Sequence, residues 1–264
     1  MAAVGVFVGA SLTLEPVSWI TLIPSALTVI FICGAGNVFN DLKDVEIDQF
    51  AHPDRVIVAG RLSMVCARRL GWGLNVLGAV VALFINLPSA LLAWLAIGFL
   101  FAYNYFLKRV PLAGNFIIAL LAGGVVLMGG MALAPEYAFE LPGPIIGGLF
   151  AFLVHLMREI VKDIQDMEAD RRFGLRSLPM LIGVRSSLLT VALFAVILCF
   201  AIFWPYREEW FGRYYLYIAA VGVIAPVLAT IATSILRPSD TSIRVLATTL
   251  KVAMGFGLLA LLAA

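Results

Sequence analysis

The sequence predicts an all-α membrane protein with about nine transmembrane helices. Of its 264 residues, 62% are hydrophobic and only 13% are charged, whereas a soluble domain carries about 45–50% apolar and roughly 25% charged residues. The mean hydropathy of +1.04 arises from repeated apolar runs of about 20 residues, the length that crosses a bilayer as a helix. These observations exclude an ordinary soluble enzyme, a disordered chain and a secreted disulfide scaffold.

Apolar periodicity and turn-forming prolines define the individual helices. The expected helices cover residues 2–12, 17–38, 64–87, 89–107, 111–134, 142–161, 177–204, 213–236 and 241–263. The first is too short to cross a hydrocarbon core of about 30 Å alone. Since the remaining loops leave no room for a separate soluble unit, we expect residues 1–264 to form a single transmembrane domain.

The basic residues indicate the orientation of the helices. Sixteen of the eighteen Lys and Arg residues fall on the side of two long loops, expected at 40–63 and 162–176, and only Arg207 and Arg213 fall on the other. The positive-inside rule then predicts a multi-pass protein of the cell membrane whose charged loops face the cytoplasm. A net charge of only +2 indicates no nucleic acid partner, and nothing in the sequence implies a protein partner.

Ten of the sixteen acidic residues gather in two short segments, 41–54 and 159–170. At about 100° per helical residue, each segment places several of its acidic side chains on one face, whereas Glu46 and Glu168 point elsewhere. The first face holds Asn40, Asp41, Asp44 and Asp48, and the second holds Glu159, Asp163, Asp166 and Asp170. Carboxylates at this spacing repel one another, so a purely structural helix would avoid the pattern.

Hard oxygen ligands of this kind suit Mg²⁺, which completes its shell with water and substrate phosphates. We therefore expect two Mg²⁺ ions, one on each acidic face, bridging to a diphosphate. A solvated charged loop without chemical function is the simplest alternative. A cation transporter is another, although transporters place such charges near the middle of the membrane. An EF-hand Ca²⁺ loop is excluded because its spacing of acidic residues is absent.

Four segments, in order along the chain, resemble motifs of the UbiA superfamily of intramembrane prenyltransferases. Residues 40–48 (NDLKDVEID) resemble the first aspartate-rich motif, and residues 166–179 (DMEADRRFGLRSLP) resemble the second. Residues 103–108 (YNYFLK) are similar to the tyrosine–lysine motif, and residues 52–61 (HPDRVIVAGR) to the segment after the first motif. The resemblance implies a bundle of about nine helices around a central cavity.

Within the superfamily, residues 158–170 (REIVKDIQDMEAD) and the pair Gly114-Asn115 are similar to the branch that makes archaeal-type ether lipids. That likeness implies Mg²⁺-dependent transfer of a geranylgeranyl group from its diphosphate to geranylgeranylglyceryl phosphate, an amphiphilic lipid acceptor. Transfer to an aromatic acceptor, as in quinone biosynthesis, stays open as the alternative. The sequence departs from the family pattern in two places. The chain begins after the family's usual Arg-Pro segment of helix 1, and Arg55 is followed by Val56 where family members often have proline.

The acidic faces, the cations near them and the resemblance together assign expected roles to individual residues. The expected catalytic residues are Asp44, Asp48, Asp166, Asp170, Lys108 and Tyr103. The expected metal ligands are Asn40, Asp41, Asp44, Asp48, Asp163, Asp166 and Asp170. The expected substrate-binding residues are Arg55, Lys108, Arg158, Lys162 and Asn115.

Overall fold

The computed structural model describes residues 1–13 and 15–264, and in those residues every regular element is helical. The elements are α1 (Ala2–Ser11), α2 (Trp19–Lys43), α3 (Val45–Ala51), α4 (Met64–Ala82), α5 (Leu87–Tyr105), the 3₁₀ turn η1 (Leu107–Arg109), α6 (Ala113–Leu133), α7 (Pro144–Arg172), α8 (Leu178–Ile182), α9 (Val184–Arg207), α10 (Arg213–Ala219), the π-helical turn η2 (Ala220–Ile224), α11 (Ala225–Leu236) and α12 (Asp240–Leu262).

Eight helical segments in this described part are long and apolar enough to cross a membrane, with α10, η2 and α11 together forming one of them. The shorter apolar helix α1 is the ninth apolar element. The expectation of an all-α, multi-pass membrane protein with about nine helices is therefore confirmed. Apolar side chains of large size are exposed along the outside of the bundle, as a lipid-facing surface requires.

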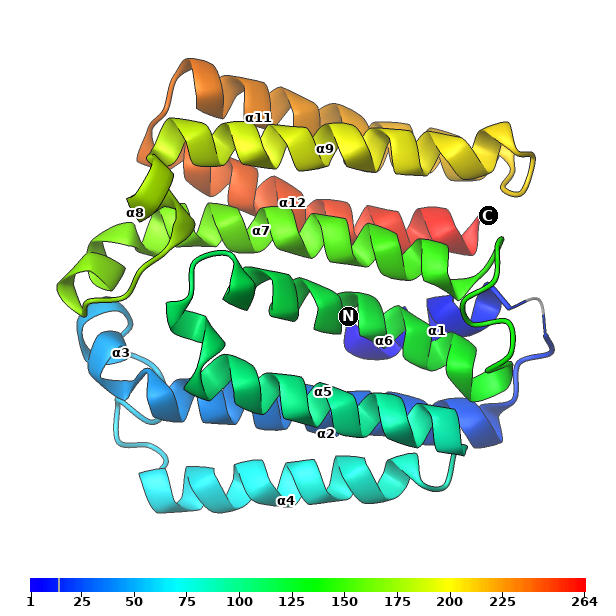
Figure 1. Ribbon diagram of the computed structural model, residues 1–264, viewed down its shortest axis with the longest axis horizontal. Coiled ribbons are helices and arrows are strands. Elements are labelled where there is room, and N and C mark those ends of the chain that lie inside the picture. Colours follow the sequence, from blue (N-terminus) through cyan, green and yellow to red (C-terminus); the bar gives the residue numbers. More distant parts are fainter. Residues whose placement is uncertain (14) are drawn as a thin grey trace.

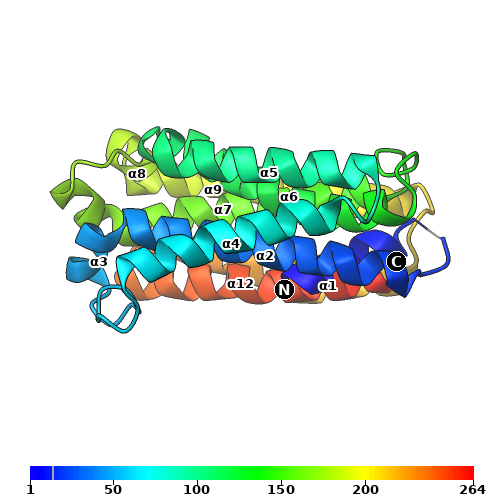
Figure 2. The same ribbon diagram turned by 90° about the horizontal axis from the view of Figure 1, so that it is seen from below.

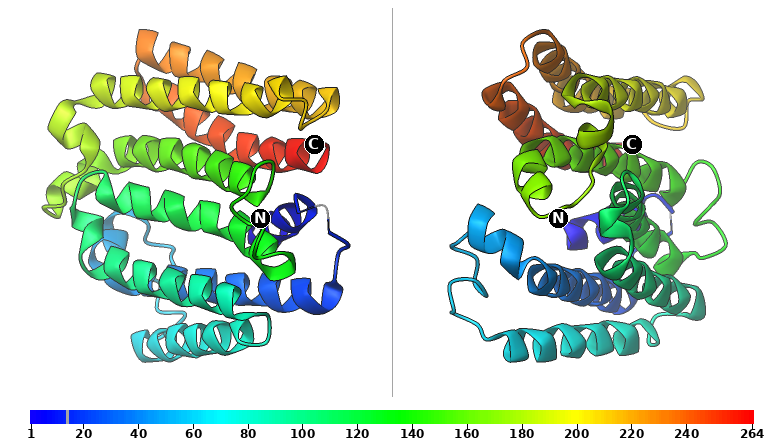
Figure 3. Two further views of the ribbon diagram at one scale, coloured as in Figure 1. Left: turned by 45° about the vertical axis from the view of Figure 1, so that its right-hand side comes forward. Right: turned by 60° about the vertical axis from the view of Figure 1, so that its left-hand side comes forward.

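The long helices lie side by side with their axes nearly aligned (Figure 1, Figure 2). α2 packs against α4 and α5, α6 packs against α7, and α7 packs against α9 and α12. The short helices α3 and α8 lie at one end of the bundle, together with the C-terminal end of α7, as Figure 3 also shows from two further sides. Both acidic segments therefore reach the same end of the molecule.

Several expected boundaries were wrong, and each has a local cause. The helix expected to end at residue 161 continues through the second acidic segment to Arg172. The segment expected as one helix over 177–204 is broken at Gly183, whose φ of +83° places it in the left-handed region where glycine is favoured. The loop expected over 40–63 contains the end of α2 and all of α3. The charged ends are thus more helical than their composition indicates.

Helix α1 packs against α6 through glycines. A Cβ atom at Gly9 would lie 1.8 Å from the carbonyl oxygen of Val126, and one at Gly129 would lie 1.8 Å from that of Val6. Backbone contacts this close are open only to residues without a side chain, and small residues are the usual means of helix packing in lipid. The short helix α1 is therefore held by its backbone against the centre of the bundle.

We expect Gly129→Ala to lower the free energy of unfolding by about 1–3 kcal/mol, the typical cost of overpacking, because the new Cβ forces α1 and α6 apart. Thermal unfolding of the detergent-solubilised protein measures the change. Gly73→Ala in α4 is the matched control, since nothing lies within 4 Å of a Cβ there. Equal melting temperatures for Gly129→Ala and the wild type would contradict the role assigned to this contact.

Candidate active site

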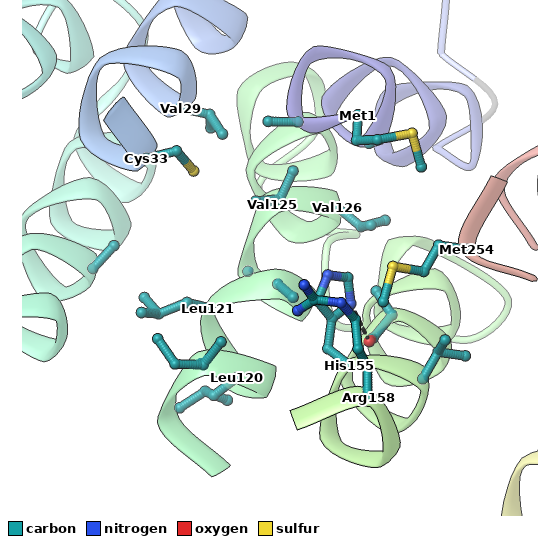
Figure 4. A pocket seen from close by; sticks show the side chains of 18 of the residues that line it. Met1, Val29, Cys33, Leu120, Leu121, Val125, Val126, His155, Arg158 and Met254 are labelled. Atoms are coloured by element: carbon teal, nitrogen blue, oxygen red, sulfur yellow. Dashed lines mark hydrogen bonds between the residues drawn. The ribbon is translucent and has the colours of Figure 1, made fainter. Parts of the chain in front are cut away.

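A cavity of about 1080 Å³ lies inside the bundle. Its walls are mostly apolar side chains of α1, α2, α5, α6, α7, α9 and α12, and the expected central cavity is thus confirmed. Figure 4 shows Cys33 of α2 and Leu121 of α6 on one side and Met254 of α12 on the other. His155 and Arg158 of α7 point into the same space.

A smaller, polar cavity of about 100 Å³ lies at the end of the bundle that carries both acidic segments. Its charged and amide-bearing walls are Asp44, Asp48, Arg55, Lys108, Asn115, Glu159, Lys162, Asp163, Asp166, Asp170 and Arg176. Four residues line both cavities, namely Arg55, Tyr103, Glu159 and Lys162. The two spaces therefore adjoin, a charged compartment at the end of the bundle and an apolar one within it.

Lys108 lies in the turn η1, directly after α5, and contacts the first acidic face. Its Nζ donates a hydrogen bond to Asn40 Oδ1 at 3.1 Å and forms an ion pair with Asp44. Asn40 Nδ2 in turn donates to Asp44 Oδ2 at 3.0 Å. Because only 8% of Asp44 is exposed, this carboxylate depends on these two partners to replace the water it has lost.

Arg55, in the turn after α3, neutralises the rest of the first face. Its guanidinium lies 3.0 Å from Asp41 Oδ1 and 2.6 Å from Asp48 Oδ2. Burial raises the pKa of the Asp48 carboxyl above its ordinary value, and the charge of Arg55 opposes that rise. The cation thus joins a carboxylate of α2 to one of α3, two like charges that would otherwise repel each other.

The second acidic face is fixed from the neighbouring helix α6. Asn115, in the first turn of α6, donates a hydrogen bond from Nδ2 to Asp163 Oδ2 at 2.8 Å. Asp166 and Asp170 follow on the same side of α7 and line the same polar cavity. At the tip of α7, Arg172 lies over the ring of Phe50 in α3, 4.1 Å from its centroid. The ends of α3 and α7 are therefore in direct contact.

All the residues proposed for the site from the sequence line one of the two cavities. Asn40, Asp41 and Arg158 line the larger cavity, and the other proposed residues line the polar one. Sequence reasoning did not assign Glu159, which lines both cavities and is paired with Arg158 at 2.5 Å. Its position on the same helical face as Asp163 was the available signal.

The donor set of the polar cavity fits Mg²⁺ shared with a phosphate ligand. In the residues that the structure describes, no group of three His, Cys, Asp or Glu side chains is placed to hold a metal by itself. Mg²⁺ requires no such cage, because it is usually held by one or two carboxylates together with water and phosphate oxygens. Paired carboxylates on two facing elements, with Lys108 and Arg55 beside them, match that requirement.

This arrangement defines a helical membrane protein that can hold a molecule with a charged head and a long apolar tail. The chain belongs to the UbiA prenyltransferase family, whose sequence profile matches residues 2–259. The family match thus agrees with the resemblance seen in the motifs. The acidic side chains lie at one end of the bundle, whereas a transporter places such charges near the middle of the membrane.

Two curated relatives carry the name digeranylgeranylglyceryl phosphate synthase. The protein of Thermococcus kodakarensis is 37% identical over 81% of this chain and 74% of its own length. That of Methanopyrus kandleri is 34% identical over 87% of this chain and 84% of its own length. A solved structure from work on digeranylgeranylglyceryl phosphate synthase in membranes has a TM-score of 0.78 and 31% identity, and covers 98% of this chain and 91% of that one.

A more distant structure shares the fold. It is a UbiA homologue from Archaeoglobus fulgidus bound to GPP and Mg²⁺, with a TM-score of 0.68 at 18% identity, covering 98% of this chain and 93% of that one.

We expect Lys108→Met to lower the free energy of unfolding by about 1–3 kcal/mol, because it leaves the buried Asp44 carboxylate without its cation. The double variant Lys108→Met/Asp44→Asn is expected to recover most of that loss, since neither charge then remains. Thermal unfolding in detergent without substrate measures both. Additive losses in the double variant would show that the pair contributes nothing to the fold.

Proposed function

We propose that this protein transfers a geranylgeranyl group from geranylgeranyl diphosphate to geranylgeranylglyceryl phosphate, forming the second ether bond of an archaeal-type membrane lipid. The observation that carries the proposal is the polar, acid-lined cavity that adjoins an apolar cavity of about 1080 Å³. The names of the curated relatives support this choice of acceptor. In this proposal residues 1–264 act as one transmembrane prenyltransferase domain.

The diphosphate head of the donor binds in the polar cavity. Asp44 and Asp48 on one face, and Asp166 and Asp170 on the other, would hold two Mg²⁺ ions, with Asn40, Asp41 and Asp163 completing the set of oxygen donors. When bound, Mg²⁺ stabilises the negative charge that develops on the departing diphosphate. The Archaeoglobus fulgidus homologue with GPP and Mg²⁺ supports metal use by this fold.

The cations of the polar cavity bind the same head directly. Lys108 and Arg55, which pair with carboxylates here, donate charge-assisted hydrogen bonds to the phosphate oxygens. Asn115 keeps Asp163 in place through their hydrogen bond. The binding of the head therefore exchanges existing ion pairs for new ones and leaves no cation without a partner.

The apolar cavity holds the tail and keeps water away from the reacting carbon. Tyr103 lines both cavities, and its ring at the junction stabilises the allylic cation that forms as the C1–O bond breaks. Exclusion of water prevents capture of that cation by hydrolysis. The hydroxyl of the acceptor then attacks C1 to form the ether.

The acceptor phosphate requires cations beyond those that bind the donor head. Arg158 and Lys162 line the apolar cavity near its charged end. Arg158 Nη1 is bonded to Glu159, and the guanidinium has five N–H donors, so its remaining donors are available to a phosphate. The acceptor thus lies with its own head beside, and not within, the polar cavity.

The charged end of the bundle faces the cytoplasm in this proposal. The support is the distribution of Lys and Arg, sixteen of eighteen of which belong to that side. The water-soluble diphosphate product is then released directly into the cytoplasm.

We expect Asp44→Ala and Asp170→Ala each to reduce turnover by on the order of 10³-fold or more, because each removes a ligand that stabilises the departing diphosphate. Initial rates of the purified proteins measure the loss. Glu46→Ala and Glu168→Ala are matched controls, since both side chains are exposed and line neither cavity. Turnover near that of the wild type in either aspartate variant would contradict the assigned metal sites.

The direct test of function supplies geranylgeranyl diphosphate, geranylgeranylglyceryl phosphate and Mg²⁺ to the purified protein and identifies the product by mass. We expect the diether product, none in excess EDTA, and recovery on addition of Mg²⁺, because the site offers hard oxygen ligands. Activity that persists in excess chelator would rule out the metal. Preferential use of an uncharged aromatic acceptor would overturn the acceptor assignment and leave the prenyltransferase class standing.

Labelling tests the orientation. In a background without the three natural cysteines, single cysteines replacing Gln49 or Gly174 should react with a membrane-impermeant thiol reagent only from the cytoplasmic side. A cysteine replacing Glu208, at the other end of α9, should react from outside. The reverse pattern would invert the proposed orientation.

A further inference from the structure

The junction of the two cavities is where the proposed reaction takes place. In a prenyl diphosphate, C1 joins the charged head to the apolar tail, so it lies where the polar cavity meets the apolar one. The acceptor hydroxyl must reach the same point. The residues that line both cavities, Arg55, Tyr103, Glu159 and Lys162, are therefore the side chains nearest to the bond that forms.

Ether formation requires the loss of a proton from the acceptor hydroxyl. Of the four junction residues, Arg55 and Lys162 are cations and Tyr103 is a phenol, whereas Glu159 carries a carboxylate. Glu159 is 9% exposed, and Arg158 balances its charge through a contact of 2.5 Å to Oε1. In the described part of the chain, Oε2 receives no hydrogen bond, so it remains available to accept one.

We propose that Glu159 is the catalytic residue that accepts this proton, an inference that rests on the proposed function. The C1–O bond to the diphosphate breaks and its bonding pair leaves with the diphosphate, and the hydroxyl oxygen of the acceptor then donates an electron pair to C1 of the allylic cation. The O–H bond of the acceptor then breaks, and its proton passes to Oε2 of Glu159. The proton leaves to solvent when the products depart, which returns the carboxylate to its starting state.

The other carboxylates of the polar cavity do not line the apolar one, namely Asp44, Asp48, Asp163, Asp166 and Asp170. Asp44 is also paired with Lys108, and Asp163 accepts a hydrogen bond from Asn115. Asp41 lines only the apolar cavity and is paired with Arg55. His155 lies one turn deeper in α7 and lines only the apolar cavity. The departing diphosphate is the competing proton acceptor, and the experiment below distinguishes it from Glu159.

The experiment compares Glu159→Gln with Glu168→Gln, a matched charge change on the same helix at an exposed position that lines neither cavity. With geranylgeranylglyceryl phosphate as acceptor, Glu159→Gln should form the ether at least about 100-fold more slowly than the wild type, the usual minimum contribution of a general base. Glu168→Gln should match the wild type.

A second acceptor isolates the proton transfer. In an analogue of geranylgeranylglyceryl phosphate the reacting hydroxyl is replaced by a thiol, which loses its proton far more readily than an alcohol, as the cysteine pKa of about 8.5 illustrates. It therefore depends much less on a base, and Glu159→Gln should form the thioether within about threefold of the wild-type rate. This selective recovery is the result expected only if Glu159 acts on the proton.

Each other result has a defined meaning. Ether formation at the wild-type rate in Glu159→Gln would assign the proton to the diphosphate and overturn the proposal. An equal loss of rate with the hydroxyl and the thiol acceptor, in a variant that still binds the donor, would also overturn it. If Glu159→Gln does not fold, Glu159→Asp decides, since a shortened carboxylate should slow only the hydroxyl acceptor. A wild-type protein that makes no ether contradicts the proposed function, independently of Glu159.

Discussion

The energetics of this structure depend on the concentration of negative charge at one end of a membrane bundle. Carboxylates at helical spacing repel one another, and a charge near the hydrocarbon region loses much of its hydration. The chain compensates with cations brought from other segments. Lys108 reaches Asp44 from the turn η1 that follows α5, and Arg55 lies between Asp41 and Asp48. The contacts that offset this repulsion also tie α2, α3 and η1 together at the charged end of the bundle.

Helix α7 connects this charged end to the interior. Its first half contributes Phe150 and Val154 to the wall of the apolar cavity, and its second half contributes Asp163 and Asp166 to the polar one. Because the helix is continuous from Pro144 to Arg172, the two compartments keep a fixed spacing along a single rigid element. A site that joins a phosphate-binding pocket to a prenyl-binding cavity needs such a fixed distance.

Much of the fold and many of the site residues could be predicted from the sequence, because both follow from local periodicity. Apolar runs of transmembrane length define the helices, and a turn of about 100° per residue groups Asp44 with Asp48 and Asp166 with Asp170. The continuation of α7 to Arg172 was not predicted, because the charged composition of residues 162–172 is typical of a loop. The grouping of the carboxylates on one face nevertheless already required these residues to be helical. Contacts between distant segments, such as that of Asn115 with Asp163, have no local signature at all.

The short helix α1 has a consequence for how the protein is assembled. Ten residues at about 1.5 Å per residue give a helix of about 15 Å, half of the hydrocarbon thickness. The backbone surface that receives α1 belongs to α6, more than a hundred residues later in synthesis. Helix α1 therefore reaches its final position only after α6 has entered the membrane.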